Sequence, residues 1–407
     1  MNSVVRWAAA LWLLAACQPA QEDPLLARAQ ELAHTYIITD GHVDLPYRMS
    51  VQRFRLSRAY LDPSGRAEGG DFDYVRAKAG GLDAPFMSIF LPSDYQQRPG
   101  ASKALADSLI DMVEALVQRH PDKFALAHSP DDVEQAFAAG KIALPMGMEN
   151  GSGIEDDLAN LAHFHRRGIR YITLTHGKDN LICDSSYDTT RTWGGLSPFG
   201  EQVVREMNRL GIMVDISHVS DSAFYDVLRL TDVPVIASHS SCRAFTPGFE
   251  RNMSDDMIRA LAANGGVIQI NFGSTFIDSA AQAHFDRMDD DLRQWAREQG
   301  LTARDSAYQA YRRQYIETHG APYSTVQVVA DHIDHVVSLV GVEHVGFGSD
   351  FDGVGDSLPT GLKDVADYPN LIRELLVRGY SEADIAQICS GNVLRVWRSV
   401  IAAAAGG

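Results

Sequence analysis

The stretch that most constrains the fold runs from Gly211 to Ser241 and contains two short apolar segments. Ile212–Ile216 and Val233–Ala237 are rich in β-branched residues, which is typical of buried parallel strands. A serine and a histidine follow each segment, and the residues between the segments carry apolar side chains at helical spacing. This pattern predicts a strand–helix–strand unit. Because parallel neighbours end on the same side of a sheet, His218 and His239 are expected to face one shared space.

Short apolar runs of this kind recur along the chain, mostly with helical patterns between them. Eight runs are predicted to be strands: Ile37–Asp40, Phe86–Leu91, Ile142–Met148, Tyr171–Leu174, Met213–Ile216, Val235–Ala237, Val267–Ile270 and Val345–Phe347. Eight alternating units favour an α/β fold of the (β/α)8 type, a TIM barrel, and a doubly wound open sheet is the alternative. We expect a single domain over residues 25–400 and a frayed tail over residues 401–407.

Two predicted connections are longer than a barrel needs. Arg48–Gly81 is charged and glycine-rich, whereas Asp278–Pro322 is charged and helix-prone. Both follow predicted strands, so both should be insertions on the C-terminal face of the barrel. Lids over the barrel mouth or subunit contacts are the roles expected of such insertions.

The N-terminus resembles an export signal. Residues 1–16 combine one arginine, an apolar run too short to span a bilayer comfortably, and small residues at the end. Leu14–Cys17 resembles the lipobox of bacterial lipoproteins, in which the cysteine is lipidated, and an ordinary cleaved signal peptide is the alternative. Residues 17–24 would form a tether. Because Gln18 follows Cys17, the resemblance implies an exported lipoprotein on the periplasmic side of the envelope, anchored in the outer membrane.

The net charge limits the possible binding partners, and the cysteine count limits the possible disulfides. The formal net charge is −17, and no basic stretch could neutralise phosphates, which excludes nucleic acid as a partner. Cys183, Cys242 and Cys389 remain after the lipobox cysteine, so at most one disulfide can form among them.

Potential metal ligands and acid–base groups follow six of the eight predicted strands. The functional residues of a (β/α)8 barrel lie at the C-terminal ends of its strands. The residues at these positions are His42, Asp44, Glu149, His176, His218, His239 and Asp350. One polar residue at a strand end is common, but a full set with three or more imidazoles predicts a catalytic metal site.

The spacing of these residues favours two metals rather than one. His42 and Asp44 lie two residues apart, so their side chains share one face of a strand and can hold one metal. His218 and His239 can hold a second metal, and the two oxygens of Glu149, which lies between the pairs in barrel order, can bridge both. This arrangement is typical of a binuclear hydrolase that activates a bridging water.

The motifs of the chain resemble those of the membrane (renal-type) dipeptidases, the zinc dipeptidases of peptidase family M19. The matching segments are TDGHVDLP at 39–46, GMENG at 147–151, YITLTH at 171–176, GLSPFGEQVVREMNRLGIMVDISH at 195–218, PVIASHSSCRA at 234–244, ERNMSDD at 250–256 and HVGFGSDFDGV at 344–354. The resemblance extends from Ile38 to Trp397. Ser152 and Gly153 depart from the Gly-His of the mammalian enzymes, and the half-cystines of those enzymes lack clear counterparts.

The resemblance implies a site residue by residue. His42 and Asp44 would bind one zinc, His218 and His239 the other, and Glu149 would bridge them. A hydroxide bridging the two zinc ions would attack the dipeptide carbonyl. The three remaining roles are proton transfer for Asp350, contact with the substrate near the scissile carbonyl for His176, and binding of the substrate carboxylate for Arg251. A homodimer is also implied.

Several alternatives stay open. The same metal site could serve a cyclic-amide or lactam hydrolase, and a periplasmic solute-binding lipoprotein is the non-enzyme alternative. Arg251 could instead pair with a neighbour such as Asp255. Other clusters are given structural roles: Asp331, His332, Asp334 and His335 as a solvated or capping helix face, His163 and His165 as surface residues, Asp289–Asp291 as a solvated charge run, and Cys242 as a small packing residue.

Overall fold

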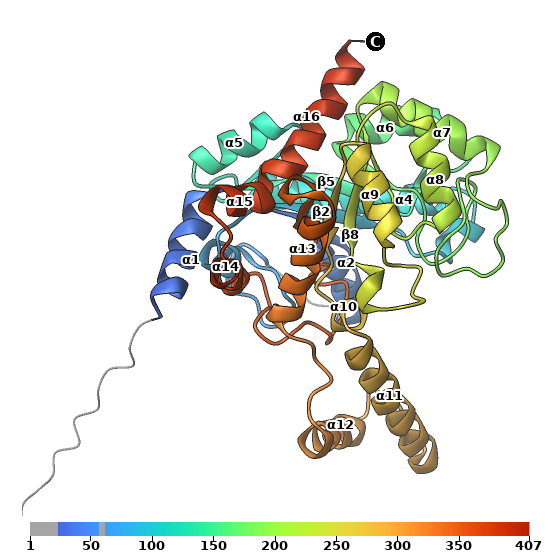
Figure 1. Cartoon of the computed structure of the whole chain (residues 1–407). Coiled ribbons are helices and arrows are strands. Elements are labelled where there is room, and N and C mark those ends of the chain that lie inside the picture. The colour runs from blue at the N-terminus through green and yellow to red at the C-terminus, as the bar shows by residue number, and fades with distance from the viewer. Residues whose placement is uncertain (1–22, 57–61, 407) are drawn as a thin grey trace, which may run out of the picture.

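The structure is a computed structural model that describes residues 23–56 and 62–406, with the side chains of residues 51–56 left out (Figure 1). The predicted signal over residues 1–16, the lipid-bearing Cys17 and most of the tether lie outside the described residues. The lipid anchor and the cellular location therefore stay predictions. The homodimer also stays a prediction. Within the described ranges, no helix has the length and apolarity needed to cross a membrane.

Eight parallel strands form one sheet in the order β1-β2-β5-β6-β7-β8-β9-β10. Their bounds are β1 (Ile38–Val43), β2 (Leu82–Phe90), β5 (Met146–Glu149), β6 (Ile169–Thr173), β7 (Met213–Asp215), β8 (Ile236–Ser240), β9 (Val267–Ile270) and β10 (Val345–Phe347). The two end strands meet where Val43 bridges Phe351, and the Asp350 amide donates to the His42 carbonyl at 3.1 Å. The sheet thus closes into the predicted (β/α)8 barrel, and the doubly wound alternative is wrong.

The predicted third strand is wrong as a single element. Residues 142–148 are divided by Pro145 into β4 (Ile142–Leu144) and β5. Only β5 belongs to the barrel, whereas β4 pairs with β3 (Phe124–Leu126) in a separate parallel sheet. A proline lacks the N–H that a continuing ladder requires, so the chain changes sheets there. The first strand also runs further than predicted, through His42 to Val43.

Helices surround the barrel and cover its N-terminal end (Figure 1). Their bounds are α1 (Pro24–Thr35), α2 (Leu45–Leu56), α3 (Tyr74–Gly80), α4 (Ala101–Arg119), α5 (Pro130–Ala138), α6 (Ala159–Arg166), α7 (Pro198–Leu210), α8 (Asp221–Leu230), α9 (Asp255–Ala263), α10 (Ser274–Ile277), α11 (Ser279–Gln299), α12 (Ser306–His319), α13 (Val326–Val340), α14 (Tyr368–Val377), α15 (Glu382–Ala386) and α16 (Asn392–Ala405). The predicted frayed tail is wrong for residues 401–405, which continue α16.

The second predicted insertion is a helical hairpin. Helices α11 and α12 project from the barrel on the side away from the C-terminus (Figure 1). The ring of Trp295 on α11 stacks on that of Tyr311 on α12, with centroids 4.3 Å apart. Their role as a lid or a subunit contact stays a prediction.

The closed end of the barrel is filled by aromatic side chains. Trp397 on α16 is fully buried and lies 5.4 Å from Phe86 of β2, measured between ring centroids. Phe86 in turn lies 5.4 Å from Tyr171 of β6. Helix α16 therefore packs through Trp397 against the aromatic side chains inside this end of the barrel.

Replacing Trp397 with alanine should remove this packing. A buried tryptophan truncated to alanine costs about 3–5 kcal/mol of unfolding free energy. Urea denaturation should show this loss, whereas Trp193→Ala should show a much smaller one because Trp193 is 42% exposed. Equal losses in the two variants would contradict the assigned role of α16.

Candidate metal centre

The strand ends bring the seven ligand and acid–base residues predicted there together at the open end of the barrel. Three groups of side chains offer ligand atoms that lie within 4.8 Å of one another. The groups are His42 with Glu149 and His239, Glu149 with His176 and His218, and His42 with Asp44 and Asp350. Because the groups share members, they form one continuous cluster with Glu149 at its centre.

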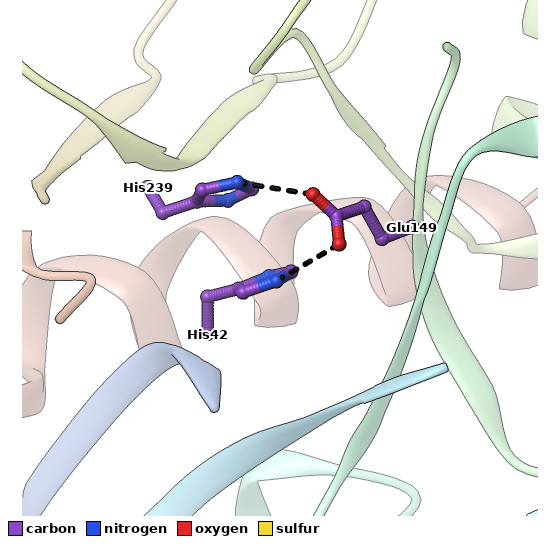
Figure 2. A group of neighbouring side chains, drawn as sticks. All are labelled: His42, Glu149 and His239. Carbon is purple, nitrogen blue, oxygen red and sulfur yellow. Dashed lines mark ion pairs between the residues drawn. The ribbon is translucent and has the colours of Figure 1, made fainter. Parts of the chain in front are cut away.

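The two oxygens of Glu149 face different sets of histidines. Oε2 lies 3.3 Å from Nε2 of His42, whereas Oε1 lies 3.1 Å from Nε2 of His218 and 3.3 Å from Nε2 of His239. Figure 2 shows the imidazoles of His42 and His239 stacked one above the other, each pointing at its own oxygen. Glu149 is only 3% exposed, so its carboxylate is taken out of water among neutral-capable rings.

The tautomer of His42 follows from its neighbour Tyr171. The Tyr171 hydroxyl donates to the Gly41 carbonyl at 2.9 Å, so it can only accept from Nδ1 of His42, which lies 2.9 Å away. In the neutral ring this assignment places the proton on Nδ1 and a lone pair on Nε2, which is the form that binds a metal. Although burial lowers the pKa of His42, the neighbouring Tyr171, Glu149 and Asp44 raise it well above its ordinary value, so in this structure Nε2 can also carry a proton beside Oε2 of Glu149. Nε2 is buried and has no hydrogen-bond partner in the described structure.

A chain of hydrogen bonds fixes His239 in the same tautomer. The Ser238 hydroxyl donates to Oδ2 of Asp215 at 2.6 Å and therefore accepts from Nδ1 of His239 at 2.7 Å. Nε2 of His239 is left with a lone pair that points at Nε2 of His218, 2.9 Å away. Nε2 of His218 also carries a lone pair, because it accepts from the Arg251 guanidinium at 3.1 Å.

These orientations fit bound cations. Burial lowers the pKa of His218 and of His239 well below the ordinary value, so both rings are neutral, the form that binds metals. Two lone pairs that face each other across 2.9 Å repel unless a cation lies beside them. Oδ1 of Asp44 is a further buried oxygen without a partner in the described structure. Imidazole nitrogens and carboxylate oxygens are the donor set that zinc prefers.

Asp350 lies beside the cluster as a carboxyl group that can hold a proton. Burial is the main reason that its pKa is raised to about 8, and the carboxylates of Asp44 and Glu149 add to the rise. Asn271 donates to Oδ2 of Asp350 at 2.8 Å. A Cβ on Gly353 would lie 2.1 Å from Asp350 and 2.2 Å from Asp44, so only glycine permits this close approach.

The backbone at two site residues has left-handed conformations. His218 has φ of 68° and Asp350 has φ of 62°. Residues other than glycine rarely adopt a positive φ, so the surrounding structure must stabilise this backbone conformation. Both residues with these angles carry side chains that belong to the ligand cluster.

His176 and Arg251 complete the predicted set. His176 is half-buried, its Nε2 lies 3.6 Å from Oε1 of Glu149, and burial lowers its pKa. Arg251 is 3% exposed and donates to the Ser240 hydroxyl at 2.7 Å and the His239 carbonyl at 2.6 Å. The alternative that Arg251 pairs with Asp255 is wrong, because Asp255 bonds His335 at 2.8 Å.

One structural prediction is wrong among the residues outside the site. His332 is not solvated but fully buried, where it accepts from the Cys242 amide at 3.0 Å and lies 2.9 Å from the Ile277 carbonyl. Cys242 is buried as predicted, and Cys183, Cys242 and Cys389 are all free. His163 is half-buried and bonds Asp107, and Asp290 pairs with Arg293 at the surface.

Sequence reasoning missed two buried aspartates that hold the strand ends. Asp215 accepts from the amides of Ser217 and Ser238 at 3.0 and 2.8 Å, and Asp40 accepts from the amides of His42 and Ser349 at 2.9 and 3.0 Å. Each aspartate interrupts an apolar strand shortly before a ligand. A charged residue inside a buried strand could have revealed this role from the sequence, because a buried carboxylate is costly unless hydrogen bonds compensate it.

Comparisons with known proteins agree with the motifs. Residues 26–406 match the membrane dipeptidase family, peptidase family M19. The chain is 35% identical over 386 residues to dipeptidase verJ of Clonostachys rogersoniana, covering 93% of this chain and 88% of that protein. The solved probable dipeptidase PvdM of Pseudomonas aeruginosa superposes with a TM-score of 0.78 at 27% identity, over 93% of this chain and 99% of that one. A solved metallopeptidase of Rhodobacter sphaeroides is liganded with a phosphinate mimic of the dipeptide L-Ala-D-Ala. It superposes with a TM-score of 0.71 at 25% identity, over 90% of this chain and 99% of that one.

Replacing Asp215 with asparagine should disturb the metal centre without touching a ligand. The new amide would donate to the Ser238 hydroxyl, which would then donate to Nδ1 of His239 and move the imidazole proton to Nε2. Loss of such a supporting contact typically lowers metal affinity about 10–100-fold. Zinc titration of the metal-free protein should show this loss in Asp215→Asn. The control Asp256→Asn changes an 85% exposed side chain and should bind as wild type. Wild-type affinity in Asp215→Asn would contradict the assigned tautomers.

Proposed function

Because the chain belongs to the membrane dipeptidases of peptidase family M19 and is a metallo-dipeptidase, we propose that it hydrolyses dipeptides with two zinc ions held on the two oxygens of Glu149. The observation that carries this proposal is the division of the ligands around one carboxylate. His42 lies at one oxygen, and His218 and His239 lie at the other. The phosphinate complex of the Rhodobacter sphaeroides relative supports a dipeptide as the substrate.

The ligands divide into two sets in this proposal. His42 and Asp44 would hold one zinc, His218 and His239 the other, and Glu149 would contact both. When bound, the ions would supply an activated water, since two metals lower the pKa of a shared water toward neutrality. The remaining steps fall to the residues around the ligands.

Asp350 is the proposed proton carrier. It lies in the ligand cluster with His42 and Asp44, and burial is the main reason that its pKa is raised to about 8. A carboxylate at this position can take the proton of the attacking water and return it to the departing amine, which is general base and then general acid catalysis. The Asn271 amide orients this carboxylate by its hydrogen bond to Oδ2.

His176 and Arg251 would position the substrate. His176 reaches the space beside Oε1 of Glu149, so its imidazole can contact the oxygen of the scissile carbonyl. Arg251 is buried, and its Nε has no partner within the described residues. A buried guanidinium with an unused donor is suited to the terminal carboxylate of a dipeptide.

The role of Glu149 predicts a large effect from a small change. Glu149→Gln removes one negative charge and one ligand oxygen, so at least one zinc should be lost and activity on a dipeptide should fall by several orders of magnitude. Elemental analysis and the rate of dipeptide hydrolysis measure the two effects. Glu298→Gln is the matched control, because Glu298 is exposed on α11, outside the ligand cluster, and accepts a hydrogen bond from Gln294. A fully active Glu149→Gln protein with one zinc or none would contradict the binuclear proposal.

The role of Arg251 predicts a loss confined to substrates with a free carboxylate. A charged hydrogen-bonded pair contributes about 1.5–3 kcal/mol, so Arg251→Ala should lower kcat/KM for a dipeptide about 10- to 150-fold. The C-terminal amide of the same dipeptide should change little, and zinc content should be kept. Arg259→Ala, at a 51% exposed arginine, serves as the control. An equal loss on the acid and the amide would mean that Arg251 supports the metal site instead.

A further inference from the structure

Three aromatic side chains gather around Arg251 at the rim of the metal centre. Tyr187 lies in the connection after β6, Phe249 in the connection after β8, and Phe276 on α10. The ring centroids of Tyr187 and Phe249 are 6.1 Å apart, and those of Phe249 and Phe276 are 5.9 Å apart. The guanidinium of Arg251 lies 5.7 Å from the Phe276 ring centroid. Three connections therefore build one aromatic wall around the proposed carboxylate site.

Tyr187 holds the most exposed position in this wall but turns its polar end inward. The residue is 41% exposed, and its ring centroid lies 5.8 Å from that of His218. Burial raises the pKa of the Tyr187 phenol, and the charge of Arg251 and a side-chain hydrogen bond with it oppose the rise. The hydroxyl thus lies next to Arg251, and the ring lies beside His218, although the residue as a whole is exposed.

The backbone under Tyr187 is fixed to the metal centre. The Ser186 amide donates to the His218 carbonyl at 2.8 Å, and Ser185 bridges Val219. The Tyr187 amide donates to the Ser185 hydroxyl at 3.1 Å, and Arg191 donates to the Ser185 carbonyl at 2.7 Å. One antiparallel bridge therefore joins the segment to His218 and Val219, and two hydrogen bonds within residues 185–191 hold the backbone before Tyr187 in place.

The hydrogen-bond capacity around Arg251 leaves donors for a ligand. Two guanidinium nitrogens of Arg251 bond Ser240, His239 and His218, but Nε is buried without a partner among the described residues. The Tyr187 hydroxyl accepts a hydrogen bond from Arg251, and within the described residues it donates to no protein oxygen. An incoming anion could accept from both groups at once, and a carboxylate has the two oxygens that this requires.

We propose that Tyr187 is a specificity-determining residue of this dipeptidase: its hydroxyl binds the terminal carboxylate of the substrate together with Arg251, and its ring closes the space beyond that carboxylate. The inference rests on the proposed function, because it assigns one end of the substrate to Arg251. A third residue in the peptide would have to occupy the space of the Tyr187 ring. The wall formed with Phe249 and Phe276 offers an apolar surface to the side chain of the second residue.

Two variants separate the hydroxyl from the ring. Tyr187→Phe removes only the hydroxyl, and Tyr187→Ala also opens the rim. Tyr225→Phe is the matched control, because Tyr225 is 37% exposed on α8 outside the barrel mouth. The zinc-loaded proteins are assayed with an alanyl dipeptide, its C-terminal amide, and the tripeptide extended by one C-terminal alanine. Zinc content and circular dichroism are recorded for each protein.

We expect Tyr187→Phe to raise KM for the dipeptide about tenfold with kcat nearly unchanged, which corresponds to about 1.4 kcal/mol. The amide should react as with wild type, because it lacks the charge that the hydroxyl binds. Tyr187→Ala should show the same rise in KM and should also increase the rate on the tripeptide relative to the dipeptide. Tyr225→Phe should match wild type on all three substrates.

Other outcomes would overturn the inference in distinguishable ways. An unchanged KM in Tyr187→Phe, or equal losses on acid and amide, would exclude carboxylate binding by Tyr187 while the dipeptidase proposal stands. A lower kcat together with lost zinc would make Tyr187 a support of His218 only. Failure of the zinc-loaded wild type to hydrolyse any dipeptide would instead overturn the proposed function, and this inference with it.

Discussion

The structure depends on the buried carboxylate of Glu149, which is surrounded by imidazole nitrogens. Glu149 is 3% exposed, and Nε2 atoms of His42, His218 and His239 lie within 3.3 Å of its oxygens. Burial of an ion costs several kcal/mol, and at Oε2 this cost is offset by His42, whose pKa is raised well above its ordinary value although burial alone would lower it. At Oε1, burial keeps His218 and His239 neutral, so they carry no charge to offset that of the carboxylate. Bound cations would compensate all of these groups together. The barrel mouth therefore gathers buried acidic and imidazole groups whose charges bound metal ions are suited to balance.

Hydrogen bonds outside the cluster hold the imidazole rings in their orientations. Tyr171 fixes the proton of His42, and Asp215 fixes that of His239 through Ser238. Asp40 binds the amide of His42 and the amide of Ser349, which ties the start of the barrel to its end next to Asp350. Closure of the barrel and orientation of the ligands are thus parts of one hydrogen-bond network.

The sequence predicted the barrel and the ligand positions because both depend on local patterns. Apolar runs mark strands, and the first polar residues after them mark the mouth, so His42, Glu149, His218 and His239 could be named from the sequence. Boundaries were less accurate where one residue decided them, as at Pro145, which moves residues 142–144 into a second sheet. Long-range contacts away from the strand ends could not be predicted. His332 reads as a helix-surface residue, yet Cys242 and Ile277, distant in the sequence, satisfy its ring in the core. Tyr187 carries no motif, and only the folded connections bring it to Arg251.

Anomalous diffraction at the zinc edge tests the central claim most directly, because it locates metal ions without reference to activity. Crystals of the wild-type protein loaded with zinc should give two peaks, one beside His42 and Asp44 and the other beside His218 and His239, each next to a different oxygen of Glu149. A single peak at full occupancy in catalytically active crystals, or a peak that Glu149 does not contact, would contradict the account.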